Sequence, residues 1–305
     1  MKKQTLIYGM IALMGIFILT GCEKESEEMK PVSDMTIAEY ALSDNNFSIL
    51  VQALSKADLV NVLNGTGNFT VFAPTNAAFT ALFNELGISG IDALTKETLT
   101  PILLYHVLGT EAKSSMITTG YYNTLSPAQG AYLSLKADVS SGVKLNKNTN
   151  VITADVDVKN GVIHVIDRVL LPPTVVDIAL ANDAFSILVQ AVVKANLVSA
   201  LSASGPFTIF APTNTAFQAL FTTLGVSGIA DLSAEQLTPI LTYHVVSGNV
   251  LSTQLQAGNV TTLNGSTITV ALSPSPTING NTGIVATDVQ GSNGVIHVID
   301  RVLLP

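Results

Sequence analysis

The chain has 305 residues, of which 48% are hydrophobic and only 12% are charged, and its net charge is −8. This composition is typical of folded domains and excludes a disordered polyelectrolyte. Nucleic acids and anionic lipid surfaces are bound through basic faces, so the acidic balance argues against both as partners of the protein surface. Cys22 is the only cysteine, which excludes a disulfide within the chain.

The first residues have the pattern of a secretory signal. Lys2 and Lys3 precede an apolar run from Leu6 to Leu19, which is short for a membrane span. We therefore expect residues 1–21 to be a signal peptide, whose removal brings the net charge to about −10.

Leu19-Thr-Gly-Cys22 resembles the lipobox of bacterial lipoproteins, which implies that Cys22 is lipidated and anchors a secreted protein to the outer membrane. An ordinary secreted protein with an incidental cysteine is the alternative. Residues 22–32 include the charged run EKESEEMK and predict a disordered tether. The acidic run also resembles a surface-export signal of some bacterial lipoproteins, although a solvated spacer would look the same.

Two motifs that each occur twice organise the rest of the chain. FTVFAPTNAAF at 69–79 returns as FTIFAPTNTAF at 207–217, and NGVIHVIDRVLLP at 160–172 returns at 293–305. The chain is thus one unit built twice. We expect two independently folding domains, the first copy at 33–172 and the second copy at 173–305, joined at Pro172-Pro173.

The early part of each copy predicts helices. A helical apolar stripe occurs at Phe47, Leu50, Val51 and Leu54, and then Phe69–Phe72 reads as a buried strand that ends at Ala-Pro. Thr75 is placed to cap the next helix, which we expect to end at Gly87.

A further helix carries a Tyr-His pair in each copy. In the first copy Thr95 or Thr100 can cap it, with Pro101 as its first residue, and it includes Tyr105 and His106. In the second copy Ser233-Ala-Glu-Gln236 has capping-box spacing, and the pair is Tyr243 and His244.

The later part of each copy predicts strands. Asn160-Gly161 and Asn293-Gly294 suit type I′ hairpin turns, because both central residues of that turn need positive φ. Asn264-Gly265 predicts another hairpin in the second copy. Helices followed by strands indicate an α+β fold.

These repeated motifs, with the Tyr-His pair between them, resemble the signature of the fasciclin domain family over nearly all of 33–305. The resemblance implies two fasciclin-like domains, each a β-wedge or sandwich packed with several α-helices. It also implies a cell-surface adhesion or binding module, not an enzyme, that contacts an extracellular matrix-type protein or glycan. The alternative is an envelope lipoprotein that binds polysaccharide as a non-catalytic component of a larger assembly.

The resemblance also implies a binding role for Tyr105, His106, Tyr243 and His244, since this region serves contact in animal members. The residues themselves favour another interpretation. Apolar side chains surround each pair on nearly every side of the helix, so we expect a buried histidine held by hydrogen bonds.

Metal and catalytic sites have little support in the sequence. His106, His164 and Asp167 could supply zinc ligands, but no recognised ligand spacing accompanies them. There is no G-x-S-x-G motif and no phosphate-binding loop, so we expect no enzyme activity, metal or cofactor. Asp167 and Arg168 read as a charge pair at a strand end.

Overall fold

The computed structural model describes residues 30–305. The expected signal peptide, Cys22 and most of the expected tether lie outside the described residues. Each copy runs from helices into strands, which confirms the α+β prediction. Within residues 30–305, none of the helices combines the length and the hydrophobicity that crossing a bilayer requires.

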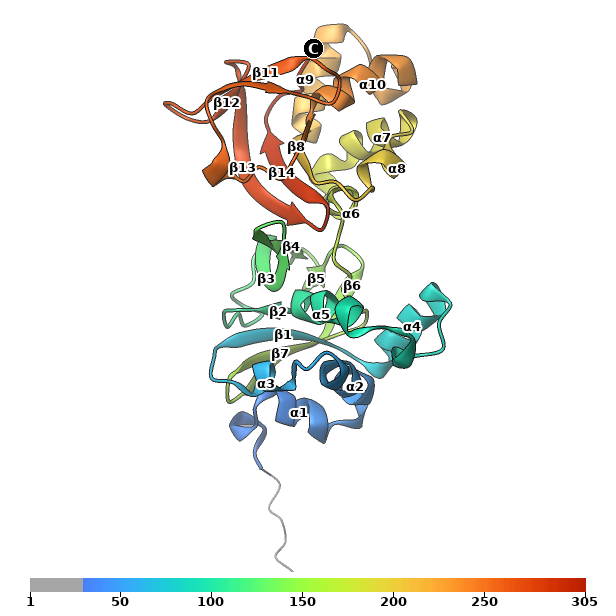
Figure 1. Ribbon diagram of the computed structural model, residues 1–305, viewed down its shortest axis with the longest axis vertical. Helices are drawn as coiled ribbons and strands as arrows, with labels where there is room; N and C mark the ends of the chain where they lie inside the picture. The colour runs from blue at the N-terminus through green and yellow to red at the C-terminus, as the bar shows by residue number, and fades with distance from the viewer. Residues whose placement is uncertain (1–29) are drawn as a thin grey trace, which may run out of the picture. The chain divides into compact units, whose positions relative to one another are not determined.

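The two copies have the same order of elements (Figure 1). The helices of the first copy are α1 (Ile37–Ser43), α2 (Ser48–Lys56), α3 (Val60–Asn64), α4 (Asn76–Leu86) and α5 (Lys96–Tyr105). Its strands are β1 (Phe69–Pro74), β2 (Val107–Leu108), β3 (Gly120–Ala128), β4 (Ala131–Asp138), β5 (Lys144–Leu145), β6 (Thr149–Val158) and β7 (Gly161–Ile166).

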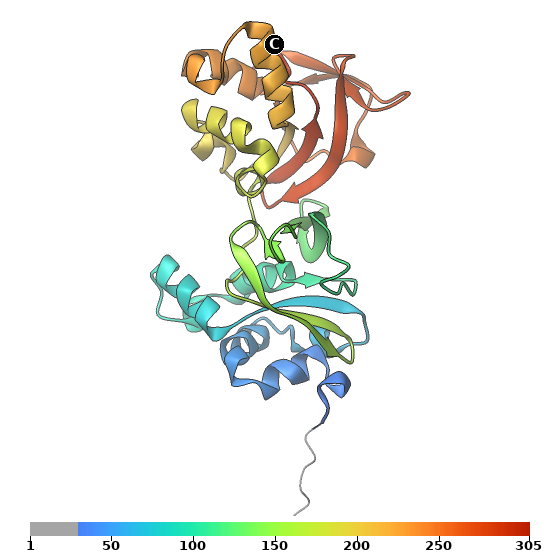
Figure 2. The same ribbon diagram turned by 180° about the vertical axis from the view of Figure 1, so that it is seen from behind.

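The second copy repeats this plan, with its helices beside its sheet (Figure 2). Its helices are α6 (Val175–Leu180), α7 (Ser186–Lys194), α8 (Val198–Leu201), α9 (Asn214–Leu224) and α10 (Ala234–Tyr243). Its strands are β8 (Phe207–Pro212), β9 (Val245–Ser247), β10 (Gly258–Thr261), β11 (Thr267–Ala271), β12 (Thr277–Ile278), β13 (Thr282–Gly291) and β14 (Gly294–Ile299).

The two repeated motifs lie side by side as the central strand pair of each copy. β1 pairs in parallel with β7, from Phe69 opposite Gly161 to Pro74 opposite Ile166, and β8 pairs with β14 in the same way. In the first copy the strands close into a barrel in the order β1 to β7. In the second copy they form a sheet in the order β10-β11-β12-β13-β14-β8-β9.

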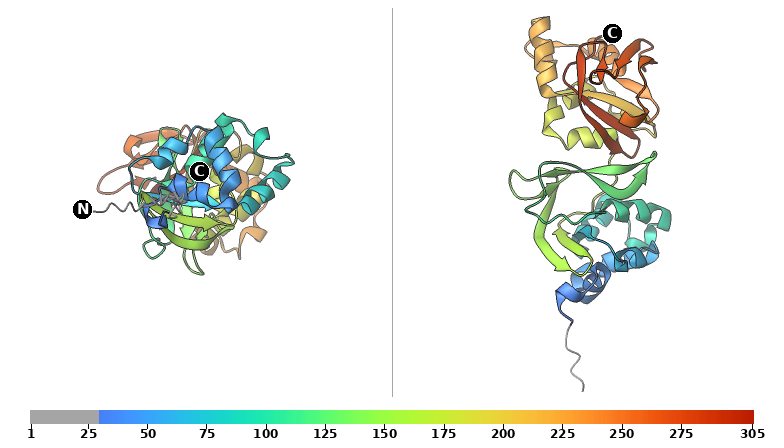
Figure 3. Two further views of the ribbon diagram at one scale, coloured as in Figure 1. Left: turned by 90° about the horizontal axis from the view of Figure 1, so that it is seen from below. Right: turned by 90° about the vertical axis from the view of Figure 1, so that its left-hand side faces the viewer.

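The central strands are buried on both faces, which explains their unbroken apolar sequence. In β1, Val71 and Ala73 pack against the helices, whereas Phe72 points into the barrel with Tyr105 and Ile166. Each copy therefore has two cores, one under the helices and one among the strands. The side view in Figure 3 shows the helices of each copy grouped beside its strands.

The helix ends follow the capping prediction with one exception. The hydroxyl of Thr75 accepts the Ala78 N–H at the start of α4, and Gly87 ends that helix at a φ of 65°. For α5 the cap is Thr95, so Pro101 lies inside the helix and the prediction that it is the first helical residue is wrong. Because Thr95 caps α5, the helix begins before Pro101 and includes Leu99, whose side chain is buried.

The Asn-Gly hairpin is present, but its turn differs from the prediction. β6 and β7 pair antiparallel up to Val158 opposite Gly161, so Lys159 and Asn160 form the loop. Only Gly161 of the Asn-Gly dipeptide has a positive φ, at 148°, so the type I′ prediction is wrong. A Cβ at Gly161 would lie 2.0 Å from the Phe69 carbonyl oxygen, so the glycine is needed for the close approach of β1.

The side chain of Asn160 is buried and joins the helices to the hairpin. Its Oδ1 accepts the Ile37 N–H at 2.9 Å, and its Nδ2 donates to the carbonyls of Leu63 at 2.8 Å and Gly65 at 2.9 Å. The side-chain amide thus satisfies a free N–H at the start of α1 and carbonyls at the end of α3. We call this arrangement the asparagine clamp.

The second copy has the same clamp. The Oδ1 of Asn293 accepts the Val175 N–H at 2.9 Å, and its Nδ2 donates to the carbonyls of Leu201 at 2.9 Å and Ala203 at 2.7 Å. Residues far apart in the sequence are therefore held together by one planar amide in each copy.

We expect Asn160→Ala to lower the free energy of unfolding by about 3 kcal/mol or more, because three buried backbone groups would lose their partner at about 1–3 kcal/mol each. Urea unfolding followed by circular dichroism measures this loss. Asn123→Ala on β3, where the side chain is exposed, is the matched control and should change little. Equal stability of the two variants would show that the clamp contributes nothing.

Candidate functional site

Both Tyr-His pairs lie in the interior, at the end of α5 and of α10. Tyr105 is fully buried, and its hydroxyl donates to the Ser134 carbonyl at 3.0 Å and accepts from Asn146 Nδ2 at 2.9 Å. Burial raises the pKa of Tyr105, an effect that the bond from Asn146 opposes. The tyrosine is thus tied to β4 and to the turn after β5.

Tyr243 has an equivalent environment in the second copy. Its hydroxyl donates to the Thr267 carbonyl at 2.8 Å and accepts from Asn279 Nδ2 at 3.0 Å. Both rings therefore contribute to the core, and neither hydroxyl lacks a partner within the fold.

His106 is also buried and uses both ring nitrogens. Nδ1 donates to the Ile102 carbonyl at 2.7 Å, and Nε2 accepts the Leu170 N–H at 2.9 Å. This pattern assigns the proton to Nδ1. The imidazole joins the end of α5 to the segment that follows β7. In the second copy, His244 makes the same bonds to Ile240, at 2.8 Å, and to Leu303, at 2.9 Å.

Burial lowers the pKa of His106 and of His244 from 6.5 to about 4, although the hydrogen bond to the Ile102 or Ile240 carbonyl acts in the opposite direction. A second proton would place an uncompensated charge in the core and would remove the acceptor for Leu170 or Leu303. Both side chains are therefore neutral at physiological pH.

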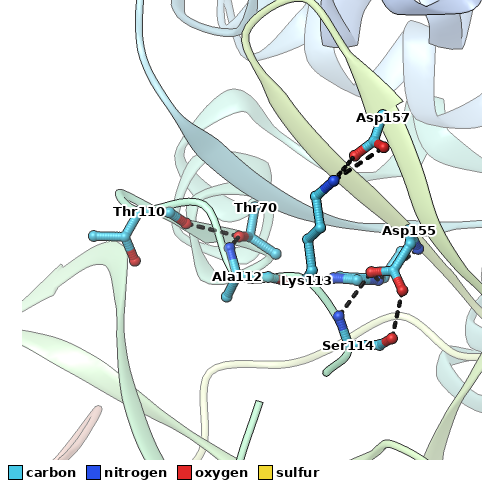
Figure 4. Close-up of polar contacts among 8 residues, drawn as sticks. Thr70, Thr110, Ala112, Lys113, Ser114, Asp155 and Asp157 are labelled. Carbon is cyan, nitrogen blue, oxygen red and sulfur yellow. Dashed lines mark hydrogen bonds and ion pairs between the residues drawn. The ribbon is translucent and has the colours of Figure 1, made fainter. Parts of the chain in front are cut away.

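The other two histidines belong to a polar cluster that extends from the interior of each copy to its surface. In the first copy it holds the segment after β2 against β1, β6 and β7 (Figure 4). The hydroxyl of Thr70 donates to the Thr110 carbonyl at 2.7 Å and accepts the Ala112 N–H at 2.8 Å. His164 Nε2 donates to the Ala112 carbonyl at 2.9 Å, and Nδ1 accepts the Asp155 N–H at 3.2 Å.

Asp155 lies at an irregularity of β6 with a φ of 60°, a conformation that aspartate tolerates better than most residues. Its carboxylate accepts the Ser114 N–H at 2.7 Å and the Ser114 hydroxyl (Figure 4). Burial acts to raise the pKa of Asp155, but the two bonds from Ser114, together with the nearby side chains of His164 and Lys113, lower the pKa. Asp288 and Ser252 repeat this arrangement in the second copy.

One contact distinguishes the first copy. Lys113 forms an ion pair with Asp157 at 3.0 Å, beside the Asp155–Ser114 contact (Figure 4). The second copy has Leu251 and Gln290 at the matching positions, so this pair is absent there. Both side chains of the pair are largely exposed, and such a pair contributes little stability.

The cluster does not have the geometry of a catalytic triad. The Ser114 hydroxyl bonds to a carboxylate and not to an imidazole, and His164 Nε2 donates to a backbone carbonyl. The serine of a catalytic triad needs an imidazole nitrogen within hydrogen-bond reach as its base. No group of three or more His, Cys, Asp or Glu residues within 30–305 is placed to hold a metal ion.

The predicted pair of Asp167 with Arg168 is wrong. Arg168 Nη1 lies 3.4 Å from Glu85 Oε1 on α4, while Asp167 accepts from the backbone N–H of Asn150 at 2.8 Å and from its side chain. Both residues lie in a bend after the end of β7, and each carboxylate or guanidinium finds its partner on another segment. The ion pair therefore links α4 to the segment after β7.

Sequence reasoning missed the residues that hold the backbone. Thr70, Ser114 and Asp155, like Asn160, have counterparts of the same type in the second copy, at 208, 252, 288 and 293. The sequence does contain a signal for these residues, because the same polar residue types occur at matching positions of the two copies.

Stability should depend on pH through His106 and His244. The folded chain resists protonation down to about pH 4, whereas the unfolded chain takes up protons below about 6.5. The contribution of the two histidines to the free energy of unfolding is therefore fully present above pH 6.5. It is lost progressively as the pH falls toward 4, by about 3 kcal/mol per histidine. Urea titrations at intervals between pH 7 and 4 measure this, and a constant midpoint would contradict it.

His106→Ala and His244→Ala should lower stability at pH 7 and weaken this pH dependence, because each leaves a carbonyl and an N–H unpaired at about 1–3 kcal/mol apiece. Any loss of ligand binding should only follow the loss of fold. If the pairs were contact residues instead, binding would fall while the melting temperature held.

Comparison with known proteins shows the family to which the chain belongs. The Fasciclin domain family model matches residues 45–172 and 183–305. The chain is 31% identical over 282 residues to transforming growth factor-beta-induced protein ig-h3 of Sus scrofa. The alignment covers 92% of this chain and 39% of that protein. It is 35% identical over 144 residues to cell surface glycolipoprotein MPB83 of Mycobacterium bovis, covering 45% of this chain and 60% of MPB83. The chain thus spans less than two thirds of either relative.

Among solved structures, a FAS1 domain pair from the insect cell adhesion molecule fasciclin I aligns with 88% of this chain and 96% of its own, at a TM-score of 0.49 and 21% identity. Fasciclin domains are linked with cell adhesion and binding in related proteins, and those relatives are secreted or lie at the cell surface. With the family model matching twice, the chain belongs to the fasciclin family and carries two fasciclin domains.

Proposed function

We propose that the protein is a cell-surface adhesion module that binds an extracellular matrix-type protein or glycan and has no catalytic role. The observation that carries this proposal is the state of the polar interior. The ring nitrogens of all four histidines, and the hydroxyls of Tyr105 and Tyr243, form hydrogen bonds within the fold. Recognition is therefore left to the outer surface, as in adhesion domains.

The surface near the end of α4 is the best candidate for this contact. Leu86 is 50% exposed and follows Glu85, and Leu171 is 42% exposed and lies shortly after Arg168. The Glu85–Arg168 ion pair brings the two segments together. Leucines also stand exposed at the matching positions of the second copy, at 224 and 304. We call these four leucines the paired leucine patches. Exposed apolar side chains repeated at matching places suit a protein or glycan contact.

Arrays of glycans and extracellular matrix proteins, probed with residues 30–305, test the proposal. We expect saturable binding to at least one ligand and a clear loss of it in the double variant Leu86→Ser, Leu224→Ser at unchanged melting temperature. Leu42→Ser, at a leucine on α1 that is 63% exposed, is the control. Absence of binding on both arrays would contradict the adhesion proposal, whereas binding that survives the double variant would move the contact away from the patches.

We further propose that Cys22 carries a lipid that anchors the protein to the outer membrane, with residues 22–32 as a tether. The Leu19–Cys22 sequence supports this, as does the description of the relative MPB83 as a cell surface glycolipoprotein. In cells fed labelled palmitate, Cys22→Ser should lose the label and leave the membrane fraction. A label that persists in the variant would disprove the anchor.

A further inference from the structure

The core of the second copy contains a cavity that is much larger than its counterpart in the first copy. The cavity has a volume of about 140 Å³ and lies between α6, α7, α8 and α10 on one side and β8 and β14 on the other. Its walls include Leu188, Leu201, Ile209 and Ile296. The same place in the first copy, walled by the matching residues of α1, α2, α3 and α5, has only about 20 Å³.

Differences between the two copies account for the extra space. Ile37 and Leu54 line the small cavity, and Val175 and Val192 take their places in the larger one. Each replacement removes one carbon from a wall. Well-packed cores leave few voids larger than a water molecule, so the enlarged space departs from ordinary packing.

Two other differences between the copies change the volume of the cavity in opposite directions. Tyr40 lines the small cavity, and its counterpart Ile178 does not reach the wall of the larger one. Ile209 is larger than its counterpart Val71 and restores one carbon. The loss of an aromatic ring and two carbons therefore exceeds the gain.

The chemistry of the walls limits what can bind. The lining residues are aliphatic apart from Phe210 and His244. Both nitrogens of His244 are already bonded, to the Ile240 carbonyl and the Leu303 N–H. An apolar cavity of this size stays free of water and accepts benzene-sized apolar molecules. With no charge and no free polar group in its walls, the site suits an uncharged hydrocarbon.

The cavity also has an apolar entrance. Leu180, Val193 and Val198 belong to its lining and are 48%, 57% and 37% exposed. In the first copy Ser55 stands where the second has Val193. A chain longer than the cavity can therefore continue outward along apolar side chains, which favours a linear ligand over a compact one.

We propose that the second fasciclin domain binds the end of an uncharged, unbranched alkyl chain in this cavity. A lipid acyl chain and a free long-chain alcohol offer the same chemistry. This site is separate from the paired leucine patches and does not depend on the adhesion proposal.

Calorimetric titration of residues 30–305 with 1-alcohols of increasing length tests the proposal. Affinity should rise about fourfold with each methylene until the chain fills the cavity, and then less steeply as the chain lies along the partly exposed entrance. Val192→Leu fills the space of about one methylene and should weaken the best alcohol about fourfold or more, with the change of slope at a shorter chain. Val175→Ile provides a second filling variant if the first does not fold.

Leu54→Val, the matched change in the first copy, should leave binding in the second unchanged. A phosphatidylcholine with short acyl chains, used below its micelle concentration, distinguishes the source: binding of both probes supports a lipid ligand, and binding of the alcohol alone supports a free hydrocarbon. Absence of saturable binding by any alcohol, or binding that neither filling variant weakens, would overturn the proposal.

Discussion

The fold of each copy depends on one asparagine side chain whose amide oxygen and amide nitrogen both form hydrogen bonds to the backbone. Asn160 sits in the loop of the β6–β7 hairpin and reaches the first N–H of α1 and the last carbonyls of α3. The same hairpin places Gly161 against the backbone of β1, where a Cβ would collide. The end of the domain is thereby attached to its beginning, and the parallel pairing of β1 with β7 follows from that attachment.

Much of this fold could be predicted from the sequence, because capping and apolar periodicity are local. Thr75 and Gly87 bound α4 as expected. The errors arose where distant parts of the chain decide. Asn160-Gly161 looked like a type I′ turn, but the need of α1 and α3 for hydrogen-bond partners gives the asparagine a different conformation. The polar cluster around Asp155 was missed because its members come from separate strands.

The histidines illustrate how a suggestive motif can serve the fold. Each imidazole forms hydrogen bonds to two backbone groups that are distant from each other in the sequence. It thereby holds two segments of the chain together. The first copy keeps a filled helical core, whereas the second has lost side-chain volume at Val175 and Val192. The second copy therefore has space in its core that side chains fill in the first copy.

Hydrogen exchange at the Ile37 and Val175 amides tests the asparagine clamp most directly. Each is the first N–H of a helix, has no acceptor within that helix, and is accepted by Asn160 or Asn293 Oδ1. The clamp predicts exchange as slow as that of the central strands, through unfolding of the whole domain. Exchange at the rate of an open first-turn amide would contradict it.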